Sequence, residues 1–274
     1  MLNKIGVMQG RLLPKYHGRY QAHPVGYWQD EFSLASKLGL DSIEFILDFN
    51  EIEKNPIMKD EGIDEINEIS EISGVEVLSI CADFFMEMPL HSKNKNNVKF
   101  SQKILKNLLK SAFQLRVSDV VIPCVDHSSL VSQEDVNNFV KNIMPMLELA
   151  EKYCINLSLE TDLDPQNFFD LLKRFDSNRI TVNYDIGNSA FMGYDPNEEL
   201  DAYGSRISDI HIKDRILGSG SVILGKGNAD FNGFFNKLKN FQYKGPFIMQ
   251  AYRDDEGLEI FKKQLDWIKP YFYA

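Results

Sequence analysis

The chain has 274 residues, of which 43% are hydrophobic and 26% are charged, so it matches an ordinary globular protein and not a disordered one. Its formal net charge is −10 and its pI is about 5.1. This charge argues against a nucleic-acid partner, because phosphates are bound by clustered Lys and Arg. The densest basic stretch, residues 93–110, interleaves lysine with leucine and is predicted to be the solvated face of a helix.

The first ten residues run directly into a predicted strand and lack the long apolar segment of a secretory signal. No apolar run approaches the roughly 18 residues that a membrane-spanning helix needs. Cys81, Cys124 and Cys154 are odd in number, lie in or beside apolar runs and have no CxxC spacing, which favours buried, reduced thiols. We therefore expect a cytoplasmic protein with no membrane partner.

Short apolar runs alternate along the chain with longer segments of helical periodicity. The predicted strands are residues 4–10, 42–47, 75–82, 119–125, 155–160, 180–185, 207–212 and 246–250. The predicted helices include residues 28–38, 102–115, 136–153, 165–175 and 231–241, with a last one over about 258–268. Strands rich in Val and Ile that alternate with helices form a parallel sheet. Eight such units favour a closed (β/α)8 barrel over a doubly wound sheet and would occupy residues 1–274 as a single domain.

The ends of the predicted helices support this pattern. Asp164 and Asp195 each precede a proline, which places a capping acid before a proline at the first helical position. Ser132 begins a plausible capping box with the acid three residues later. Gly39 and Gly74 follow helical patterns at positions where a left-handed terminal residue is needed.

In a barrel of this kind the active site is built at the C-terminal ends of the strands. Almost every predicted strand ends in a polar or ionisable residue, so we expect the site among these residues. They are Gln9, Gly10, Arg11, Glu44, Asp83, Asp126, His127, Glu160, Asp185, Asn188, His211, Lys213, Asp214, Gln250 and Arg253.

Three of these residues form a metal-binding pattern. Glu160, Asp185 and His211 end consecutive strands and are 25 and 26 residues apart, which is about one βα unit in each case. The barrel would bring their two carboxylates and one imidazole to a single point. Such ligands suit a divalent ion, Mn²⁺, Zn²⁺, Co²⁺ or Mg²⁺, with coordination positions left open for a substrate.

Several segments resemble the xylose-isomerase-like TIM barrels, a family that includes sugar and sugar-phosphate isomerases and epimerases and, distantly, endonuclease IV. The segments are LSLETD, VNYDIGNSAFMGYDP, DIHIKDR and GKGNADF, and the resemblance extends back through LGLDSIEFI to IGVMQGRL near the start. It implies that a metal is held at the ends of strands five to eight, by Glu160, Asp185, His211 and Gln250. It also implies that the family's two acidic positions, here Glu160 and Gln250, exchange a proton next to a sugar carbonyl through a metal-stabilised enediolate.

Gln250 departs from the family pattern, which has a carboxylate at this position. An amide oxygen can coordinate a metal, but it cannot accept a proton, so a symmetrical epimerisation with two carboxylates would need another group. Isomerisation by Glu160 alone is one possibility, and recruitment of Lys213, Asp214 or His127 as a base is another. The third possibility is a barrel that binds a sugar without turning it over. Alternatively, strand eight is misaligned, and an acid from residues 254–256 takes the place assigned here to Gln250.

Lys213 is predicted to be catalytic, because it shares the strand face of His211 and would neutralise an enediolate or hold a phosphate. The loop over residues 11–29 is long, aromatic and basic, and is predicted to be a lid or wall over the sugar, or else a subunit contact. For the remaining groups ordinary solvation or structural hydrogen bonding is the alternative to a role in binding. The predicted substrate contacts are Arg11, Glu44, His127, Asn188, Asp214, Arg215 and Arg253.

These features predict a metal-dependent sugar or sugar-phosphate isomerase or epimerase whose partner is a small sugar. A dehydratase or lyase acting on a polyol or keto acid would use the same metal site, need one base and tolerate Gln250. A carbohydrate-binding barrel without catalysis is the alternative from a different class. The resemblance also implies a homo-oligomer.

Overall fold

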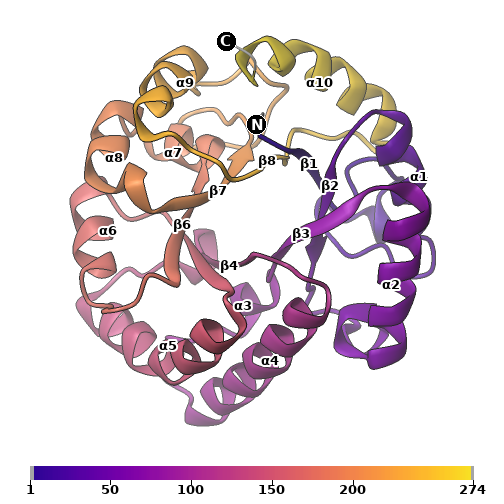
Figure 1. The fold of residues 1–274 in the computed structure, drawn as a ribbon. Coiled ribbons are helices and arrows are strands. Elements are labelled where there is room, and N and C mark those ends of the chain that lie inside the picture. Colours follow the sequence, from indigo (N-terminus) through magenta and orange to yellow (C-terminus); the bar gives the residue numbers. More distant parts are fainter. Residues whose placement is uncertain (1–2, 273–274) are drawn as a thin grey trace.

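The computed structural model describes residues 3–272, in which eight parallel strands close into a barrel in chain order (Figure 1). The last strand closes the barrel by pairing with the first through Ile5, Gly6 and Val7. All eight predicted strands and the (β/α)8 fold are therefore confirmed. The strands are β1 (Ile5–Met8), β2 (Ser42–Ile46), β3 (Glu76–Cys81), β4 (Asp119–Cys124), β5 (Asn156–Thr161), β6 (Ile180–Asp185), β7 (Ile207–Ile212) and β8 (Phe247–Met249).

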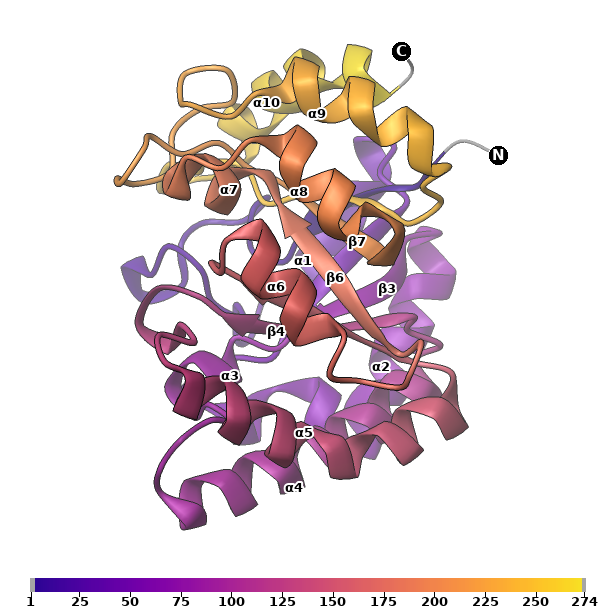
Figure 2. The ribbon, with the colours of Figure 1, turned by 90° about the vertical axis from the view of Figure 1, so that its left-hand side faces the viewer.

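Helices surround the barrel, and Figure 2 shows the chain termini at one end and the long loops that follow the strands at the other. None of the helices within residues 3–272 is long and apolar enough to cross a membrane. The α-helices are α1 (Asp30–Lys37), α2 (Asp60–Ser73), α3 (Phe84–Glu87), α4 (Lys95–Gln114), α5 (Gln133–Tyr153), α6 (Pro165–Leu172), α7 (Ile186–Met192), α8 (Pro196–Tyr203), α9 (Phe231–Leu238) and α10 (Leu258–Phe272). Short 3-10 helices are η1 (Tyr16–Gly18), η2 (Ile52–Lys54), η3 (Pro56–Met58), η4 (Asp126–Ser128), η5 (Gly204–Arg206) and η6 (Lys239–Phe241).

Each predicted helical segment is found, and the predicted capping residues are confirmed. Asp164 and Asp195 cap α6 and α8 by accepting backbone N–H groups, and Ser132 takes part in a reciprocal capping box at α5. Gly39 and Gly74 have φ values of 70° and 72°. Helix α4 begins seven residues before its predicted start. Its first turns are polar and so lack the apolar pattern used for the prediction, but the side chain of Asn94 caps them.

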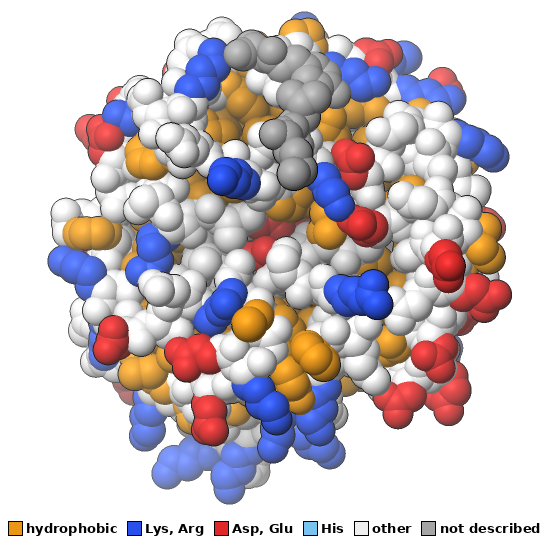
Figure 3. Space-filling view, viewed as in Figure 1, with side chains coloured by type: hydrophobic (Ala, Val, Ile, Leu, Met, Phe, Trp, Pro, Cys, Tyr) orange, Lys and Arg blue, Asp and Glu red, His pale blue; other side chains and the backbone are white. Residues whose placement is uncertain are grey.

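The basic stretch predicted to be a solvated face is the outer side of α4. Its lysines are exposed, whereas Ile104, Leu105, Leu108 and Leu109 are buried against the protein. Figure 3 shows the end of the barrel where the chain begins, with lysine and arginine side chains gathered along the edge over α4 and acidic ones over α2. Cys81 and Cys124 are buried as predicted, but Cys154 is exposed, because it ends α5 in a left-handed conformation.

The interior of the barrel is divided into an apolar and a polar side. Met8, Ile46, Cys81, Val121 and Ile248, from β1 to β4 and β8, form a buried cluster separate from the main core between strands and helices. On the other side, alternate residues of β5, β6 and β7 are buried and polar, and Glu44 of β2, Ser79 of β3 and Asp119 of β4 join them through hydrogen bonds. The polar side rises to the strand ends, where the predicted metal ligands lie.

A bulge in β7 sets the direction of its side chains. Val182 pairs with Ile207, but the next residue of β6, Asn183, pairs with Asp209, so Ser208 is an extra residue in β7. Because side chains alternate between the two faces of a strand, one extra residue moves every later side chain to the opposite face. The bulge therefore places Asp209 and His211 on the inner face.

Glu31 on α1 holds the loop that follows β1. Its carboxylate accepts the backbone N–H groups of Gly10 and Leu12, at 2.6 and 2.9 Å, and so fixes the chain on both sides of Arg11. Burial raises the pKa of Glu31 to about 7, although these two hydrogen bonds oppose the increase. The folded chain therefore binds this proton more tightly than the unfolded chain.

The substitution Glu31→Gln tests this pKa. A raised carboxyl pKa gives stability that is complete below the unfolded value of about 4.5 and is lost as the pH rises through about 7. Glutamine does not titrate, so the unfolding free energy of the parent protein minus that of the variant should fall by roughly 2.5 kcal/mol between pH 5 and pH 8. Urea unfolding at both pH values measures it, and an unchanged difference would contradict the raised pKa.

Candidate active site

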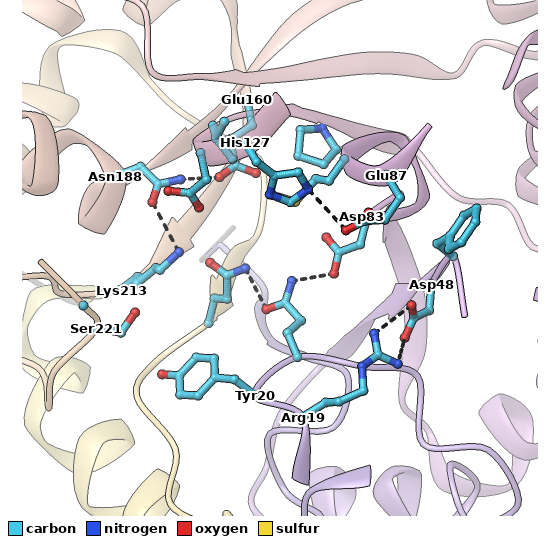
Figure 4. Close-up of a pocket in the computed structure, with 18 of the residues that line it drawn as sticks. Arg19, Tyr20, Asp48, Asp83, Glu87, His127, Glu160, Asn188, Lys213 and Ser221 are labelled. Carbon is cyan, nitrogen blue, oxygen red and sulfur yellow. Dashed lines mark hydrogen bonds and ion pairs between the residues drawn. The ribbon is translucent and has the colours of Figure 1, made fainter. Parts of the chain in front are cut away.

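A cavity of about 440 Å³ opens at the C-terminal ends of the strands (Figure 4). This volume lies within the range of small-ligand sites. Glu160, Lys213 and Gln250 lie on its wall with side chains from the loops after β1, β2, β3 and β4. Tyr20 and its neighbours from the loop after β1 line the cavity too, so this loop forms a wall, as predicted.

Glu160, Asp185 and His211 come together as a possible metal centre. Each is buried and offers one ligand atom, and the three atoms lie within 4.8 Å of one another. Two further observations fit a metal at this point. Among the described residues, His211 Nδ1 and Gln250 Oε1 are buried without a hydrogen-bond partner. The donor set, two carboxylates, one imidazole nitrogen and one amide oxygen, suits a divalent cation.

His211 is oriented from below by Glu44. Its Nε2 lies 2.7 Å from Glu44 Oε1, and its Nδ1 faces Asp185 Oδ2 at 3.9 Å. A carboxylate behind the second ring nitrogen is the usual support for a metal-binding histidine, since it fixes the ring and leaves the other nitrogen free to coordinate. Glu44, which was predicted to contact substrate, is fully buried in the barrel, does not line the cavity and contacts His211 instead.

Asp209 lies beside Glu44 and His211, and the three could also hold an ion by their spacing. Burial, and then the charge of Glu44, raises the pKa of Asp209 well above its usual range. Asp209 therefore keeps its proton next to the Glu44 carboxylate. This cluster supports His211 from beneath the cavity.

Asp185 is held in its ionised form at the junction of β6 and α7. Its Oδ1 accepts the backbone N–H of Asn188 at 2.9 Å, which caps α7, and its Oδ2 accepts from Lys213 Nζ at 3.1 Å. Burial alone would raise the pKa of Asp185, but Lys213, His211 and the cap together lower it. These contacts favour the ionised form of Asp185.

Glu160 is the group in the cluster that most readily holds a proton. Burial, and then the charge of the neighbouring Asp185, raises its pKa to about 8, against the opposing effects of His211 and Lys213. Its Oε1 accepts from Asn188 Nδ2 at 2.6 Å. Because Glu160 also lies on the cavity wall, its carboxyl can exchange a proton with a bound molecule.

Asn188 joins these groups to one another. Besides donating to Glu160, its Oδ1 accepts from Arg215 Nη1 at 2.8 Å and from Lys213 Nζ at 3.3 Å. It lines the cavity as expected for a substrate contact, but its polar atoms are already paired. The guanidinium of Arg215 lies over the ring of Phe191, with 3.9 Å to the ring centroid.

Two other predicted substrate contacts do not reach the cavity. Asp214 is buried and accepts three backbone N–H groups, from Gly225, Gly227 and Ala229, so it shapes the loop after β7. It follows Lys213 directly, and neighbouring residues of an extended chain point to opposite sides. Arg253 is buried and donates to backbone carbonyls in the loop after β1. In this structure both side chains stabilise loops.

Arg11 and His127 do line the cavity, in different surroundings. The buried Arg11 guanidinium donates to the carbonyl oxygens of Ala251 and Tyr20 and to Gln21 Oε1, so it builds the wall. His127 lies at the exposed rim with its Nε2 3.2 Å from Glu87. Both side chains therefore remain part of the cavity lining.

A chain of side chains across the cavity was not predicted. Gln250 Nε2 donates to Gln21 Oε1 at 3.1 Å, and Gln21 Nε2 donates to Asp83 Oδ2 at 2.7 Å. Figure 4 shows Asp83 pointing into the cavity. Asp83 could be recognised in the sequence as a strand-end acid, but Gln21 lies in an irregular loop, where no spacing rule applies.

The substitution Glu44→Gln tests the support of His211. Glutamine keeps the size of the side chain but removes its charge, which makes the His211 ring a weaker ligand. We expect metal affinity, measured by calorimetric titration of metal-free protein with Mn²⁺ or Zn²⁺, to fall about tenfold or more. Ser79→Ala is the control, because Ser79 donates to the same carboxylate without touching His211. Unchanged affinity in Glu44→Gln would contradict the proposed orientation.

Comparison with known proteins places this geometry in a family. Residues 32–271 match the family described as Xylose isomerase-like TIM barrel. L-ribulose-5-phosphate 3-epimerase UlaE of Escherichia coli (strain SMS-3-5 / SECEC) is 25% identical over 263 residues, covering 91% of this chain and 92% of that protein. Among solved structures, a D-tagatose 3-epimerase-like protein superimposes with a TM-score of 0.78 at 19% identity, covering 98% and 97% of the two chains. The IOLI protein with a bound zinc atom gives 0.77 at 19% identity, covering 99% and 100%. The chain belongs to the xylose isomerase-like TIM barrel family.

Proposed function

We propose that the protein is a metal-dependent epimerase that acts on a ketose or a ketose phosphate. The observation that carries this proposal is the double position of Glu160, which belongs to the metal-binding cluster and also lies on the wall of a sugar-sized cavity. Its raised pKa suits a group that takes and returns a proton near neutral pH. The similarity to sugar epimerases such as L-ribulose-5-phosphate 3-epimerase supports the same reaction.

In this proposal Glu160, Asp185, His211 and Gln250 hold the metal. A divalent ion bound there would stabilise the negative charge that develops on the sugar oxygen as the neighbouring C–H bond is broken. Glu160 takes the proton from that carbon, while Asn188 keeps its carboxyl directed at the cavity. Lys213, fixed between Asp185 and Asn188, adds positive charge beside the reacting oxygen.

The rim beside Lys213 suits a phosphate group on the sugar. Arg215 and Ser221 lie on this side of the cavity, and Arg215 is held by Asn188 and by the ring of Phe191. A guanidinium fixed in this way is a good partner for a phosphate. We therefore include a ketose 5-phosphate among the substrates to be tested.

A dehydratase acting through the same metal site is the second candidate, and Gln250 is the observation that favours it. Removal of water needs one base, and Glu160 would supply it without a carboxylate at residue 250. Product mass separates the two reactions, because dehydration lowers the mass by one water and epimerisation leaves it unchanged.

The test is turnover of L-ribulose 5-phosphate and free L-ribulose by protein loaded in turn with Mn²⁺, Co²⁺, Zn²⁺ or Mg²⁺. In H2O we expect an epimer whose mass equals that of the substrate. In D2O the epimer should carry one deuterium. Removal of the metal by a chelator should stop turnover, and adding the metal back should restore it. If the protein loaded with each of the four ions shows no turnover, this result would contradict the proposed enzyme and favour a sugar-binding barrel.

The substitution Glu160→Gln should lower turnover by about 10²- to 10⁴-fold, because the amide cannot accept the proton. Glu87→Gln is the matched control: Glu87 also lines the cavity, but at the exposed rim. It should retain most of the activity. Metal content is measured for both variants by mass spectrometry, and an active Glu160→Gln protein with full metal content would contradict the role of Glu160.

A further inference from the structure

We propose that Asp83 is the second proton-transfer group of the site, working with Glu160 on the other face of the sugar. The inference rests on the proposed epimerase function and answers the question that Gln250 raises. An epimerase that inverts a carbon removes a proton from one face and returns one to the other. Gln250 cannot do this, whereas Asp83 is a carboxyl group that lines the same cavity.

The position of Asp83 suits this task. It follows β3 at the start of α3, two strands along the barrel from Glu160, and its carboxyl points into the cavity that Glu160 also lines (Figure 4). Its two oxygens each have one neutral donor: Gln21 Nε2 at 2.7 Å and Cys81 Sγ at 3.2 Å. These contacts fix the carboxyl group while it remains partly exposed to the cavity.

The other carboxyl groups described around the cavity are less suited to proton transfer. Asp48 is buried in a two-point ion pair with Arg19, with distances of 2.6 and 2.9 Å. Glu87 is exposed at the rim beside His127, and Asp126 is half exposed there, 3.7 Å from Arg215. Asp83 makes no ion pair with any residue in the range 3–272. It can therefore gain and lose a proton without breaking one.

The surroundings of Asp83 also favour a group that carries a proton. Burial raises its pKa, and the hydrogen bonds from Gln21 and Cys81 only partly oppose this. A raised pKa brings a carboxyl group closer to the pH range in which it can both give and take a proton. The geometry of the cavity, and not this shift, identifies the residue.

The neutral amide at residue 250 then has a positioning role. Gln250 and Arg11 both donate to Gln21 Oε1, at 3.1 and 2.7 Å, and so turn Gln21 with its Nε2 toward Asp83. A carboxylate at residue 250 would bring an acceptor against this acceptor oxygen and would favour a rotated Gln21. The rotation would remove the donor from Asp83. Gln250 therefore positions Asp83, the acid that follows β3, and is not itself an acid.

One carboxyl group removes a proton and the other supplies one. The carboxylate of Glu160 takes the proton from the carbon next to the carbonyl; the C–H bond pair becomes a C=C bond, and the carbonyl π pair moves to oxygen. Asp83 then gives its proton to the opposite face of the same carbon, the C=C pair forms the new C–H bond, and the carbonyl returns. Glu160 ends protonated and Asp83 ionised. Exchange with water through the open cavity resets both groups.

The test uses the metal-loaded protein, its Asp83→Asn variant and its Glu160→Gln variant, each incubated in D2O with one epimer and separately with the other. Asparagine keeps the acceptor for Gln21 and cannot carry the proton. We expect Asp83→Asn to invert about 10²- to 10⁴-fold more slowly. It should still exchange deuterium into the epimer whose C–H faces Glu160, and not into the other. Glu160→Gln should show the reverse pattern. KM should change little in Asp83→Asn.

Glu87→Gln is again the matched control, since Glu87 lines the cavity at its exposed rim beside His127 and has no part in the proposed proton transfer. Thermal melting and metal content verify that each variant is folded and loaded. Inversion by Asp83→Asn at the rate of the parent protein would overturn the inference, as would loss of exchange from both epimers. In either case an active parent protein would leave the proposed epimerase function standing. A parent protein that inverts neither epimer would refute that function and, with it, the role of Asp83.

Discussion

The hydrogen bonds at the junction between β6 and α7 determine the arrangement of the candidate site. Asp185 caps α7 through the N–H of Asn188, and the Asn188 side chain reaches Glu160 on one neighbouring strand and Lys213 and Arg215 beyond the other. Such a cap satisfies the free N–H groups of a helix start, so the same bonds that begin α7 also orient Asp185 and Glu160, to which we assign the metal and the proton transfer. Gly187 leaves room for Lys213 in this space, because a Cβ there would lie 2.6 Å from Lys213 Cγ.

The polar side of the barrel interior supports this arrangement from below. His211 stands between two sets of groups, with Glu44 and the protonated Asp209 under its Nε2 and the cavity cluster at its Nδ1. Buried polar groups are costly unless they are paired, and a paired network is rigid. Part of the barrel interior is therefore polar, and these polar groups hold the imidazole of His211 in place. The bulge at Ser208 is the backbone feature that makes this possible, because it turns the following residues of β7 inward.

The fold and the centre of the site follow from regular spacing, and so the sequence predicts them. Strands and helices of regular length alternate in a barrel, so Glu160, Asp185 and His211, one unit apart, had to meet at one end of it. The position of a residue near a strand end does not tell how deep its side chain lies. For this reason Glu44 is found beneath the site and Asp214 within a loop, although both looked like substrate contacts.

The contacts that join distant loops were beyond such rules. Gln21 touches Asp83 and Gln250, which are 62 and 229 residues away, and the turns of an irregular loop decide both contacts. The sequence shows that residue 250 is an amide and that another carboxyl would be needed for inversion. It does not show which of the strand-end acids lines the cavity outside an ion pair. That distinction depends on Arg19 pairing with Asp48 and on Gln21 turning toward Asp83.

The central claim is that one divalent ion binds between β5, β6, β7 and β8, within reach of a bound sugar. Its most direct test is the anomalous diffraction of crystals grown with Mn²⁺ after the protein has been stripped of metal. We predict a single strong peak per chain at coordination distance from the carboxylates of Glu160 and Asp185 and from His211 Nδ1, with Gln250 Oε1 as the fourth protein ligand. No peak, or a peak that touches none of these atoms, would contradict the account.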